Sequence, residues 1–451
     1  MVKRKERIAC ILSLEGADWV SCKTIVPNLF KLYKKSFPEA EIKTFHYADS
    51  MEDYEYFLTI SGLVDFLPDK IIICDHKPHP ARLIRSLFKE FGEDRVPSVY
   101  CHLFGDFSLY APHWWDLEFY LQRMNIHFIA ASHRQVNFVK QFIEGGEEFV
   151  SYLPFPADDK KFCFSKDKRK SARNKFFPHG RNETRFLYSG RLSAQKNTIS
   201  LIRSFKDFLT LSGSNASLHI VGFFDDLAYP FFGIHYPPEL NRYEFLEELN
   251  SYDDSIKSRI EFVENLSSDQ LIDYYQACDV LVSTGLHNDE DYGMSPAEAK
   301  CCGMSLILSN WGGYASFSLP DAFTSLVNVS LVDSFYQVDY KHFIKLLIKY
   351  DTTKKTDEDR KKLSSMAVKR FGIDGNIPHL LDIHSLKIKK FSSWNRKFQK
   401  FSGCFKNSSS NPFGLINSPK KNELGLKDLI EEGLQSKSIY RSCYNEYVDF
   451  A

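Results

Sequence analysis

The sequence predicts an α/β protein with two doubly wound parallel sheets and a helical tail. Continuous apolar runs of strand length, such as RIACILSL at 7–14, alternate along the chain with patterns of helical periodicity. Because parallel strands are joined by helices, this alternation favours doubly wound sheets. The chain has 451 residues, which is enough for two or three domains with sizeable cores.

The first domain is predicted to span 1–160. Its further strands are expected at 42–46, 70–74, 98–103 and 127–131 and from 151, and its helices after 19, over 53–67 and 80–91, and from 132. The last strand leads into a proline-rich exit, which marks the end of the domain.

The second domain is predicted to span 185–382. Residues 161–184 are rich in Lys and Arg and poor in apolar residues, so they are expected to form a linker or surface loop with a solvated charged face. Beyond them, strands are expected at 186–188, 217–221, 260–263, 279–282 and 304–308, and helices at 269–277, 340–350 and 357–371. Residues 223–258 have the composition of an insertion that contains a polar helix.

The tail, 383–451, is predicted to be helical. An aromatic stripe with Lys and Arg at its edges occupies 387–401 at helical spacing. Such a stripe either packs back on the first domain, which the pattern favours, or lies on an anionic membrane surface as a peripheral contact. Residues 402–422 are rich in Ser, Asn, Gly and Pro, which predicts a loop, and one more helix is expected at 423–434.

Composition excludes several classes of function. The formal net charge is zero, so nothing draws the whole chain to nucleic acid. The apolar runs are far shorter than the ~20 residues that a membrane-spanning helix needs. The ten cysteines show no Cys-x-x-Cys pair, and the first residues do not resemble a secretory signal. A cytoplasmic setting is expected, with an option of peripheral attachment to the inner face of the membrane.

The most informative stretch runs from 281 to 314, where a strand leads through a polar loop into a helix. Ser295 is predicted as the N-cap of that helix and Pro296 as its first residue, with Glu298 on the first turn and Glu290 in the loop. The free N–H groups of such a terminus suit an anion such as a diphosphate. The competing interpretation is that Ser-x-x-Glu serves only as a capping box.

A second stretch, RFLYSGRLSAQKN at 185–197, places two cations after the carboxyl end of a strand. Arg191 offers a planar fork and Lys196 a point charge, and both are suited to a phosphate group. A lone Gly-Arg-Leu carries little information. Together with the 281–314 stretch, about 100 residues downstream, it favours an anion site over the interpretation as a capping box alone.

With these residues the chain resembles a retaining GT-B-fold glycosyltransferase of family 4, the glycosyl transferases group 1. The resemblance rests on Gly190-Arg191-Leu192, on Lys196, on Glu290-x7-Glu298, and on a Gly-Gly after the next strand. Tyr292 stands where the family usually has Phe. The resemblance is sharp over 185–315, weaker over 1–160 and absent after about 385. It implies two Rossmann-like domains facing across a cleft, with the acceptor side in the first.

The resemblance also implies roles for individual residues. His102, at the end of the 98–103 strand, and Glu290 are the expected catalytic residues. His102 is preferred to His76 and His79, which have only position to recommend them, although a lone histidine is more often part of a sheet edge. The expected donor-binding residues are Gly16, Arg191, Lys196, Asn265, Leu266, Gly293, Met294, Ser295 and Glu298. No metal or cofactor is expected.

The implied activity is sugar transfer from a UDP- or GDP-sugar to an acceptor hydroxyl, with retention at the anomeric carbon. The acceptor is expected to be a glycan or lipid-linked molecule, in polysaccharide, lipopolysaccharide or glycolipid assembly. The alternatives are a nucleotide-sugar epimerase or hydrolase of the same fold, and a non-catalytic scaffold. A nicotinamide-dependent dehydrogenase is disfavoured, because no Gly-x-Gly-x-x-Gly follows the first strand.

Overall fold

The structure is a computed structural model that describes most of the chain. The described residues are 4–12, 21–47, 51–74, 80–93, 95–105, 107, 111–177, 183–225, 239–264, 266–286, 290–318, 323–332 and 335–406. They divide into two compact units. Unit 1 contains the described residues up to Pro156 and those from Ile373 onward, and unit 2 lies within Ala157–Gly372.

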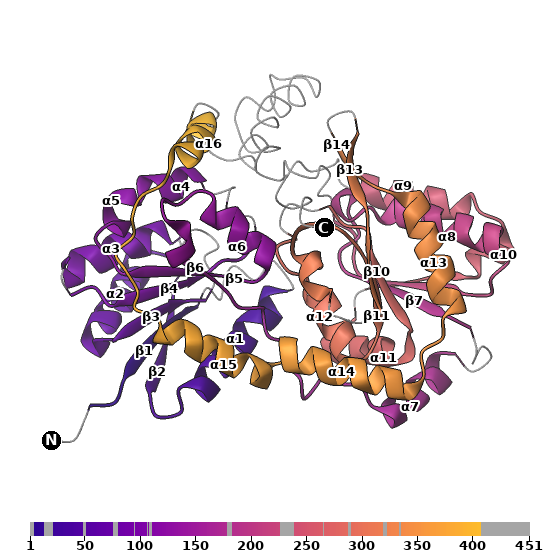
Figure 1. Ribbon diagram of the computed structural model, residues 1–451, viewed down its shortest axis with the longest axis horizontal. Helices are drawn as coiled ribbons and strands as arrows, with labels where there is room; N and C mark the ends of the chain where they lie inside the picture. Colours follow the sequence, from indigo (N-terminus) through magenta and orange to yellow (C-terminus); the bar gives the residue numbers. More distant parts are fainter. Residues whose placement is uncertain are drawn as a thin grey trace. The chain divides into compact units, whose positions relative to one another are not determined.

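Unit 1 contains a six-stranded parallel sheet, as the apolar runs predict (Figure 1). Its strands, in spatial order, are β2 (Glu41–His46), β1 (Arg7–Leu12), β3 (Lys70–Ile73), β4 (Ser98–His102), β5 (Ile126–Ala130) and β6 (Val150–Tyr152). Its helices are α1 (Cys22–Ser36), α2 (Asp53–Phe66), α3 (Ala81–Phe91), α4 (Ala111–Asp116), α5 (Glu118–Leu121), α6 (His133–Lys140), α15 (Ile373–Ser385) and α16 (Arg396–Lys406). The central strands are almost completely buried, because helices cover parallel sheets on both faces.

Unit 2 repeats this architecture with a second six-stranded parallel sheet. Its strands, in spatial order, are β12 (Thr324–Val327), β11 (Ser305–Ser309), β10 (Val280–Ser283), β7 (Arg185–Ser189), β8 (Ser217–Val221) and β9 (Ile260–Val263), beside a hairpin of β13 (Val329–Val332) and β14 (Phe335–Val338). Its helices are α7 (Lys166–Phe176), α8 (Thr198–Ser212), α9 (Leu240–Asn250), α10 (Asp254–Lys257), α11 (Ser268–Ala277), α12 (Met294–Cys301), α13 (Tyr340–Thr352) and α14 (Asp357–Phe371).

The strand order of unit 2 places a topological switch point between β7 and β10. From β7 the chain moves outward through β8 to β9, then returns to the other side of β7 and moves outward again through β10, β11 and β12. Loops that leave the carboxyl ends of β7 and β10 therefore diverge, and open α/β sheets bind their ligands in the crevice formed there. The two informative stretches of the sequence follow these two strands.

The residues at 161–184 differ from the expected linker. Helix α7 occupies Lys166–Phe176, with Ser165 as its N-cap, whose side chain accepts a hydrogen bond from the Lys168 N–H. Its charged face is not fully solvated, because Arg169 is buried against the residues that lead into β10. Composition alone missed this helix, since the partner for its arginines lies about 110 residues away in the sequence.

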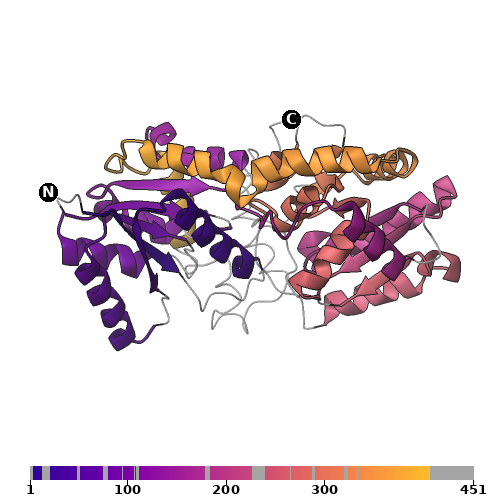
Figure 2. The same ribbon diagram turned by 90° about the horizontal axis from the view of Figure 1, so that it is seen from below.

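The tail also differs in part from expectation. Helix α15, assigned by the sequence to the second domain, packs on α1 in unit 1, where indigo α1 lies beside orange α15 (Figures 1 and 2). The helix expected through 388–401 begins only at Arg396. The preceding segment is extended and forms isolated bridges, Lys390 to Asn125 and Trp394 to Ile143. Residues 407–451, with the expected loop and last helix, lie outside the described residues.

The aromatic stripe of the tail is a packing surface of unit 1. Phe391, Trp394 and Phe398 are at most 5% exposed. The Trp394 ring lies 4.4 Å from Phe398 and 5.8 Å from Phe107 between centroids, and its indole N–H donates to the Trp114 carbonyl at 2.9 Å. These rings are unavailable to a membrane, so the peripheral contact expected through 387–401 cannot rest on them. No helix among the described residues is long and apolar enough to cross a bilayer.

Candidate active site

The carboxyl ends of β7 and β10 carry the strongest candidate residues, and the structure connects the two loops directly. The Leu286 N–H, after β10, donates to the Gln195 carbonyl, after β7, at 3.0 Å. The Asn197 side-chain amide donates to the Thr284 carbonyl at 2.8 Å. Asn197 adopts a left-handed conformation, with φ of 55°, which ends the 3₁₀ turn that carries Lys196 and starts α8.

Lys196 and Glu290 form an ion pair across this switch point. The Lys196 ammonium donates to Glu290 Oε2, and the two side chains are 16% and 8% exposed. Gly285 leaves room for the pair, because a Cβ there would lie 3.3 Å from Lys196 Cδ and 3.4 Å from Glu290 Oε2. Two residues that the sequence placed in separate stretches thus meet in one partly buried site.

Arg191 has a different partner. Its Nη1 donates to Asp225 Oδ2 at 2.7 Å, and Asp225 lies in the segment after β8. The Arg191 carbonyl accepts a hydrogen bond from the Tyr188 hydroxyl at 2.5 Å, which fixes the turn after β7. Arg191 and Lys196 therefore do not converge on each other. Each is held beside its own carboxylate, and neither points into bulk solvent.

The helix of the 281–314 stretch begins earlier than predicted. Gly293 is the N-cap and Met294 the first residue of α12, and no side chain caps the terminus. The prediction of Ser295 as N-cap was wrong because Gly293 adopts φ of 109°, a backbone conformation that favours glycine, and turns the chain two residues sooner. A Cβ on Gly293 would also lie 2.8 Å from Tyr314 Cε1.

The first turn of α12 is suited to an anion. Gly293, Met294 and Ser295 are partly exposed, whereas the residues from Pro296 onward are buried. First-turn N–H groups have no partner within a helix, and the positive end of the helix dipole lies there. Because Pro296 has no N–H, the donors of this turn come from Met294 and Ser295.

Glu298 lies inside α12 and is not part of a capping box. The Tyr275 hydroxyl, from α11, donates to Glu298 Oε2 at 3.3 Å. Burial raises the pKa of Glu298 to about 8, and the Tyr275 hydrogen bond opposes the shift. The capping interpretation therefore fails, and Glu298 is a buried carboxyl group that carries a proton at neutral pH in this state.

The comparison with protein families decides the identity of this region. The family described as Glycosyl transferases group 1 matches residues 170–362, which lie entirely within unit 2. This part of the chain is similar to the group 1 glycosyltransferase domain. The match spans both loops of the switch point, and Arg191, Lys196, Glu290 and Glu298 all lie inside the matched residues.

Solved glycosyltransferases share the fold. Anabaena HepE, solved with UDP and glucose, has a TM-score of 0.58 at 14% identity, covering 84% of this chain and 99% of that one. A glycosyltransferase from Rickettsia africae has 0.58 at 13%, covering 84% and 98%. Sucrose-phosphate synthase from Thermosynechococcus elongatus has 0.55 at 13%, covering 84% and 98%. The comparison with curated proteins finds no match.

The structure says less about the other expected site residues. Gly16 and Asn265 lie outside the described residues. Leu266 is partly exposed between β9 and the N-cap of α11. Within the described ranges, no group of three or more His, Cys, Asp or Glu residues is arranged to hold a metal ion.

His102 lies in unit 1 as the last residue of β4 and is 1% exposed. Its Nε2 shares a hydrogen bond of 2.8 Å with the Tyr33 hydroxyl of α1, and Nδ1 has no partner. Tyr33 also contacts the ring of His384 from α15. Burial lowers the pKa of His102 to about 3, so the ring is neutral at pH 7. His102 is therefore buried at the end of β4 against Tyr33 of α1, which in turn contacts His384 of α15.

Four residues of this candidate site were missed by the sequence analysis: Asp225, Tyr275, Gly285 and Tyr314. Tyr314 shares a hydrogen bond of 2.9 Å with Ser283, the last residue of β10, and burial followed by the charge of Glu290 raises its pKa. Gly285 and Tyr314 lie inside the stretch that the sequence analysis selected, where each follows the end of a strand. No sequence signal points to Asp225 or Tyr275.

Proposed function

We propose that the protein transfers a sugar from a nucleotide-diphosphate donor, a UDP- or GDP-sugar, to an acceptor hydroxyl with retention of anomeric configuration. The observation that carries the proposal is the set of cations at the switch point of unit 2. Lys196 and Arg191 follow β7, and both are held in place by carboxylates. The N-terminus of α12, which no side chain caps, lies in the segment after β10. The structure of HepE with UDP-glucose supports UDP-glucose as a first donor to test.

The leaving group explains why these cations are needed. Cleavage of the sugar–phosphate bond leaves negative charge on the diphosphate, and fixed positive groups stabilise that charge without reorganisation during the reaction. On this proposal, the diphosphate and the donor sugar bind beside the two cations that Asp225 and Glu290 hold in place. Arg191, Lys196 and the N–H groups of Met294 and Ser295 then face the diphosphate, and no step calls for a metal ion.

Glu290 and Glu298 are assigned different tasks. Glu298 accepts hydrogen bonds from the ribose hydroxyls, and these donors favour its ionised form. Glu290 lies beside the donor sugar, where it holds sugar hydroxyls and stabilises positive charge at the anomeric carbon. The resemblance assigns Leu266 and Asn265 to the nucleobase, and it assigns Gly16 to donor binding.

The reaction proceeds on one face of the sugar. The bond between the anomeric carbon and the phosphate oxygen breaks, and its electron pair stays with the diphosphate. The acceptor oxygen attacks from the same face, and its proton passes to the phosphate oxygen that has just left. Atoms and charges balance without a protein nucleophile, and this chain's residues serve to bind, orient and stabilise.

The test has two stages. A thermal-shift screen of UDP-, GDP- and ADP-sugars identifies the donor, because a ligand that prefers the folded state raises the melting temperature. Proton NMR of the product formed with glycan and lipid-linked acceptors then reports the anomeric configuration. Retention supports the proposal. Inversion contradicts it, and release of free nucleotide without any acceptor favours the epimerase or hydrolase alternative.

The role of His102 needs its own test. The resemblance assigns it to the donor sugar or the acceptor, whereas its contact with Tyr33 describes a buried structural residue. His102→Asn preserves a polar group and His102→Phe preserves the ring volume. If both variants keep the wild-type melting temperature and both lose turnover, the catalytic role is supported. If turnover falls only in step with melting temperature, the role is structural.

A further inference from the structure

A cavity of about 310 Å³ lies at the opposite edge of the unit 2 sheet from the donor site. Its lining includes Thr184, Val280 and Ser305, which stand at the amino ends of β7, β10 and β11. Helix α7, the segment 353–355, Tyr350 of α13 and Arg360 of α14 also line it. The cavity is therefore separate from the site at the carboxyl ends.

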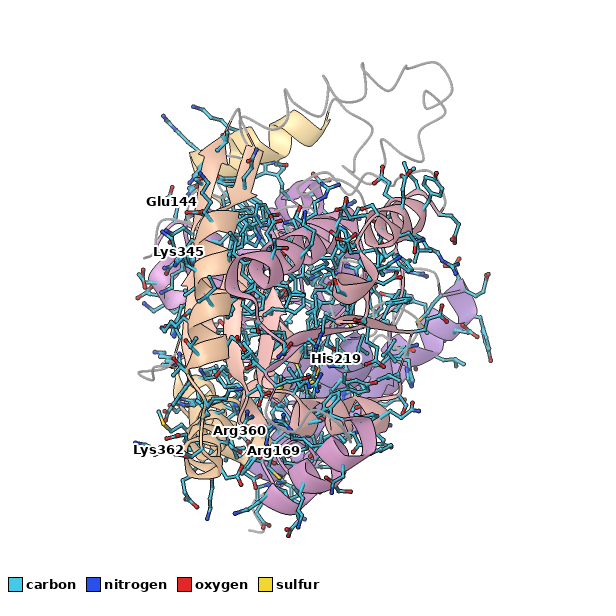
Figure 3. All side chains as sticks on the ribbon, turned by 90° about the vertical axis from the view of Figure 1, so that its right-hand side faces the viewer. Glu144, Arg169, His219, Lys345, Arg360 and Lys362 are labelled. Atoms are coloured by element: carbon cyan, nitrogen blue, oxygen red, sulfur yellow. The ribbon has the colours of Figure 1, made fainter. Side chains whose placement is uncertain are left out.

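Three arginines converge on one aspartate in this cavity. Arg169, Arg173 and Arg360 donate to Asp279 at 2.7, 3.2 and 2.5 Å, and they come from α7 and α14. In Figure 3, Arg169 and Arg360 lie beside one another at the lower end of unit 2. Among the described contacts, three guanidinium groups therefore share one carboxylate, which leaves an excess of positive charge at this point.

The neighbouring carboxylates balance this excess only in part. The charge of Asp357, at the start of α14, acts on Arg360, but Asp357 also pairs with Lys166 at 3.6 Å. Glu183, the other carboxylate of the lining, already pairs with Arg185 at 2.7 Å and with Arg259 at 3.2 Å. Lys355 is a further basic side chain of the lining. Its ammonium donates to the Gly303 carbonyl at 2.8 Å and lies 5.3 Å from the Phe323 ring, and no carboxylate of the described residues pairs with it.

The lowered pKa values of two of the basic groups reflect the electrostatic cost of this arrangement. Burial, followed by the charge of Arg360, lowers the pKa of Lys355 well below its ordinary value. Burial lowers the pKa of Arg360 to about 10, although Asp279 opposes the shift. Like charges this close in a partly dry site repel one another, and an anion between them would remove that penalty.

Part of the cluster has a structural purpose. Arg169 also donates to the Gln276, Ala277 and Cys278 carbonyls, which anchors α7 to the end of α11. One arginine is enough to neutralise Asp279, however, and anchoring does not require an adjoining cavity lined by Lys354 and Lys355. The surplus charge and the open volume are what anchoring leaves unexplained.

We propose that this cavity binds the phosphate group of a small phosphorylated molecule, at a site distinct from the donor site. Arginine forks and a lysine ammonium are the groups that recognise phosphate in proteins. The volume lies at the lower end of the range for small-molecule pockets, about 300–1,000 Å³, which limits the ligand to roughly the size of a monosaccharide phosphate. The proposal does not depend on the function proposed for the carboxyl edge.

The test measures binding of inorganic phosphate and of glucose 6-phosphate by calorimetry, with chloride at equal ionic strength as the reference. The protein is the full chain carrying Arg191→Ala and Lys196→Ala, which weakens phosphate binding at the donor site. In this background, Lys355→Gln is the first test variant, and Lys354→Gln is a separate second test variant. Lys362→Gln is the matched control, because Lys362 is exposed on α14 and lies at the periphery in Figure 3.

The expected result is saturable binding of both ligands that is about tenfold weaker in Lys355→Gln and unchanged in Lys362→Gln. Glucose, which lacks the phosphate, should not bind. If Lys355→Gln does not fold, Lys354→Gln decides, since that lysine is exposed. Absence of saturable binding above the chloride reference overturns the proposal, and so does unchanged affinity in the folded lysine variants.

Discussion

The two edges of the unit 2 sheet hold similar side chains in opposite arrangements. At the carboxyl edge, Arg191 and Lys196 pair with separate carboxylates among the described residues. At the amino edge, Arg169, Arg173 and Arg360 share Asp279. A one-to-one pair can exchange its carboxylate for a ligand anion without a change in net charge, whereas a shared carboxylate ties several elements together. The comparison predicts that the first edge governs catalysis and the second stability.

The largest effect is expected when both cations of the carboxyl edge are removed. Arg191→Ala with Lys196→Ala should reduce turnover by about 10³-fold, because two charged donors to the leaving diphosphate are lost. Steady-state kinetics with the identified donor provide the measurement. The control is Arg203→Ala with Lys206→Ala on α8, where Arg203 is 58% exposed and pairs with Glu248. Equal turnover in the two double variants would show that Arg191 and Lys196 matter no more for catalysis than the control cations on α8.

The matching change at the amino edge is Asp279→Asn. It leaves the buried Arg169 and Arg360 and the partly exposed Arg173 without their carboxylate, which should lower the free energy of unfolding by about 3–5 kcal/mol. Urea denaturation measures the change, and Asp254→Asn, at a 98% exposed side chain, is the control. A variant that keeps its stability would show that the arginine cluster does not tie α7 and α14 to the sheet.

The pH dependence of stability sharpens this prediction. Burial alone would raise the pKa of Asp279, but Arg360, Arg169 and Arg173 outweigh it and hold the pKa well below its usual range. The stabilisation is therefore present above the unfolded pKa of about 3.9 and lost as the pH falls further through the folded value. The Asp279→Asn variant should lack this acid-dependent loss.

A smaller effect on turnover is expected for Glu290→Gln. The amide keeps the size of the side chain but removes the negative charge beside the donor sugar, so turnover should fall by about 100-fold. Donor affinity should hold or rise, because Lys196 loses its anionic partner and becomes free for the phosphate. Calorimetry and kinetics on the same preparation separate the two quantities. Parental turnover would refute the role assigned to Glu290.

The smallest expected signal is a proton released on donor binding. Burial raises the pKa of Glu298 to about 8, and ribose hydroxyls that donate to it should bring the pKa back down. At pH 7 up to about 0.9 protons per bound donor should be released. Calorimetry in buffers of different ionisation enthalpy counts them, and Glu298→Gln should abolish the release. Release that persists in the variant would come from another group.

The same carboxyl group affects stability in the unliganded protein. Because its folded pKa lies above the unfolded value, the contribution of Glu298 is full below about pH 4.3 and is lost as the pH rises through about 8. Thermal melts of wild type and Glu298→Gln across this window should converge at low pH and diverge at high pH.

The sequence analysis predicted the two sheets well, because buried parallel strands are continuous apolar runs that need no partner to be recognised. The expected strands at 217–221 and 260–263 match β8 and β9 residue for residue. It also found Lys196 and Glu290, since each follows a strand end. Helix α7 and the extended segment at 386–395 were missed because their structure depends on distant partners, Asp279 and Ile143.

The site could be predicted only as far as local sequence defines it. The start of α12 depends on the conformation of Gly293, which a capping-box pattern two residues later concealed. Asp225 and Tyr275 come from segments without a motif, and only the tertiary structure brings them to Arg191 and Glu298. The structural pairing of His102 with Tyr33 likewise depends on α1, which is distant in sequence.

The central claim is that two cations and a helix terminus hold the diphosphate of the donor. The most direct test is calorimetric titration of wild type and of Arg191→Ala with Lys196→Ala with UDP and GDP, in EDTA. The account predicts that wild type binds one nucleoside diphosphate in EDTA and that the double variant, with an unchanged melting temperature, binds it at least about 100-fold more weakly. Equal affinity in the two proteins would contradict it.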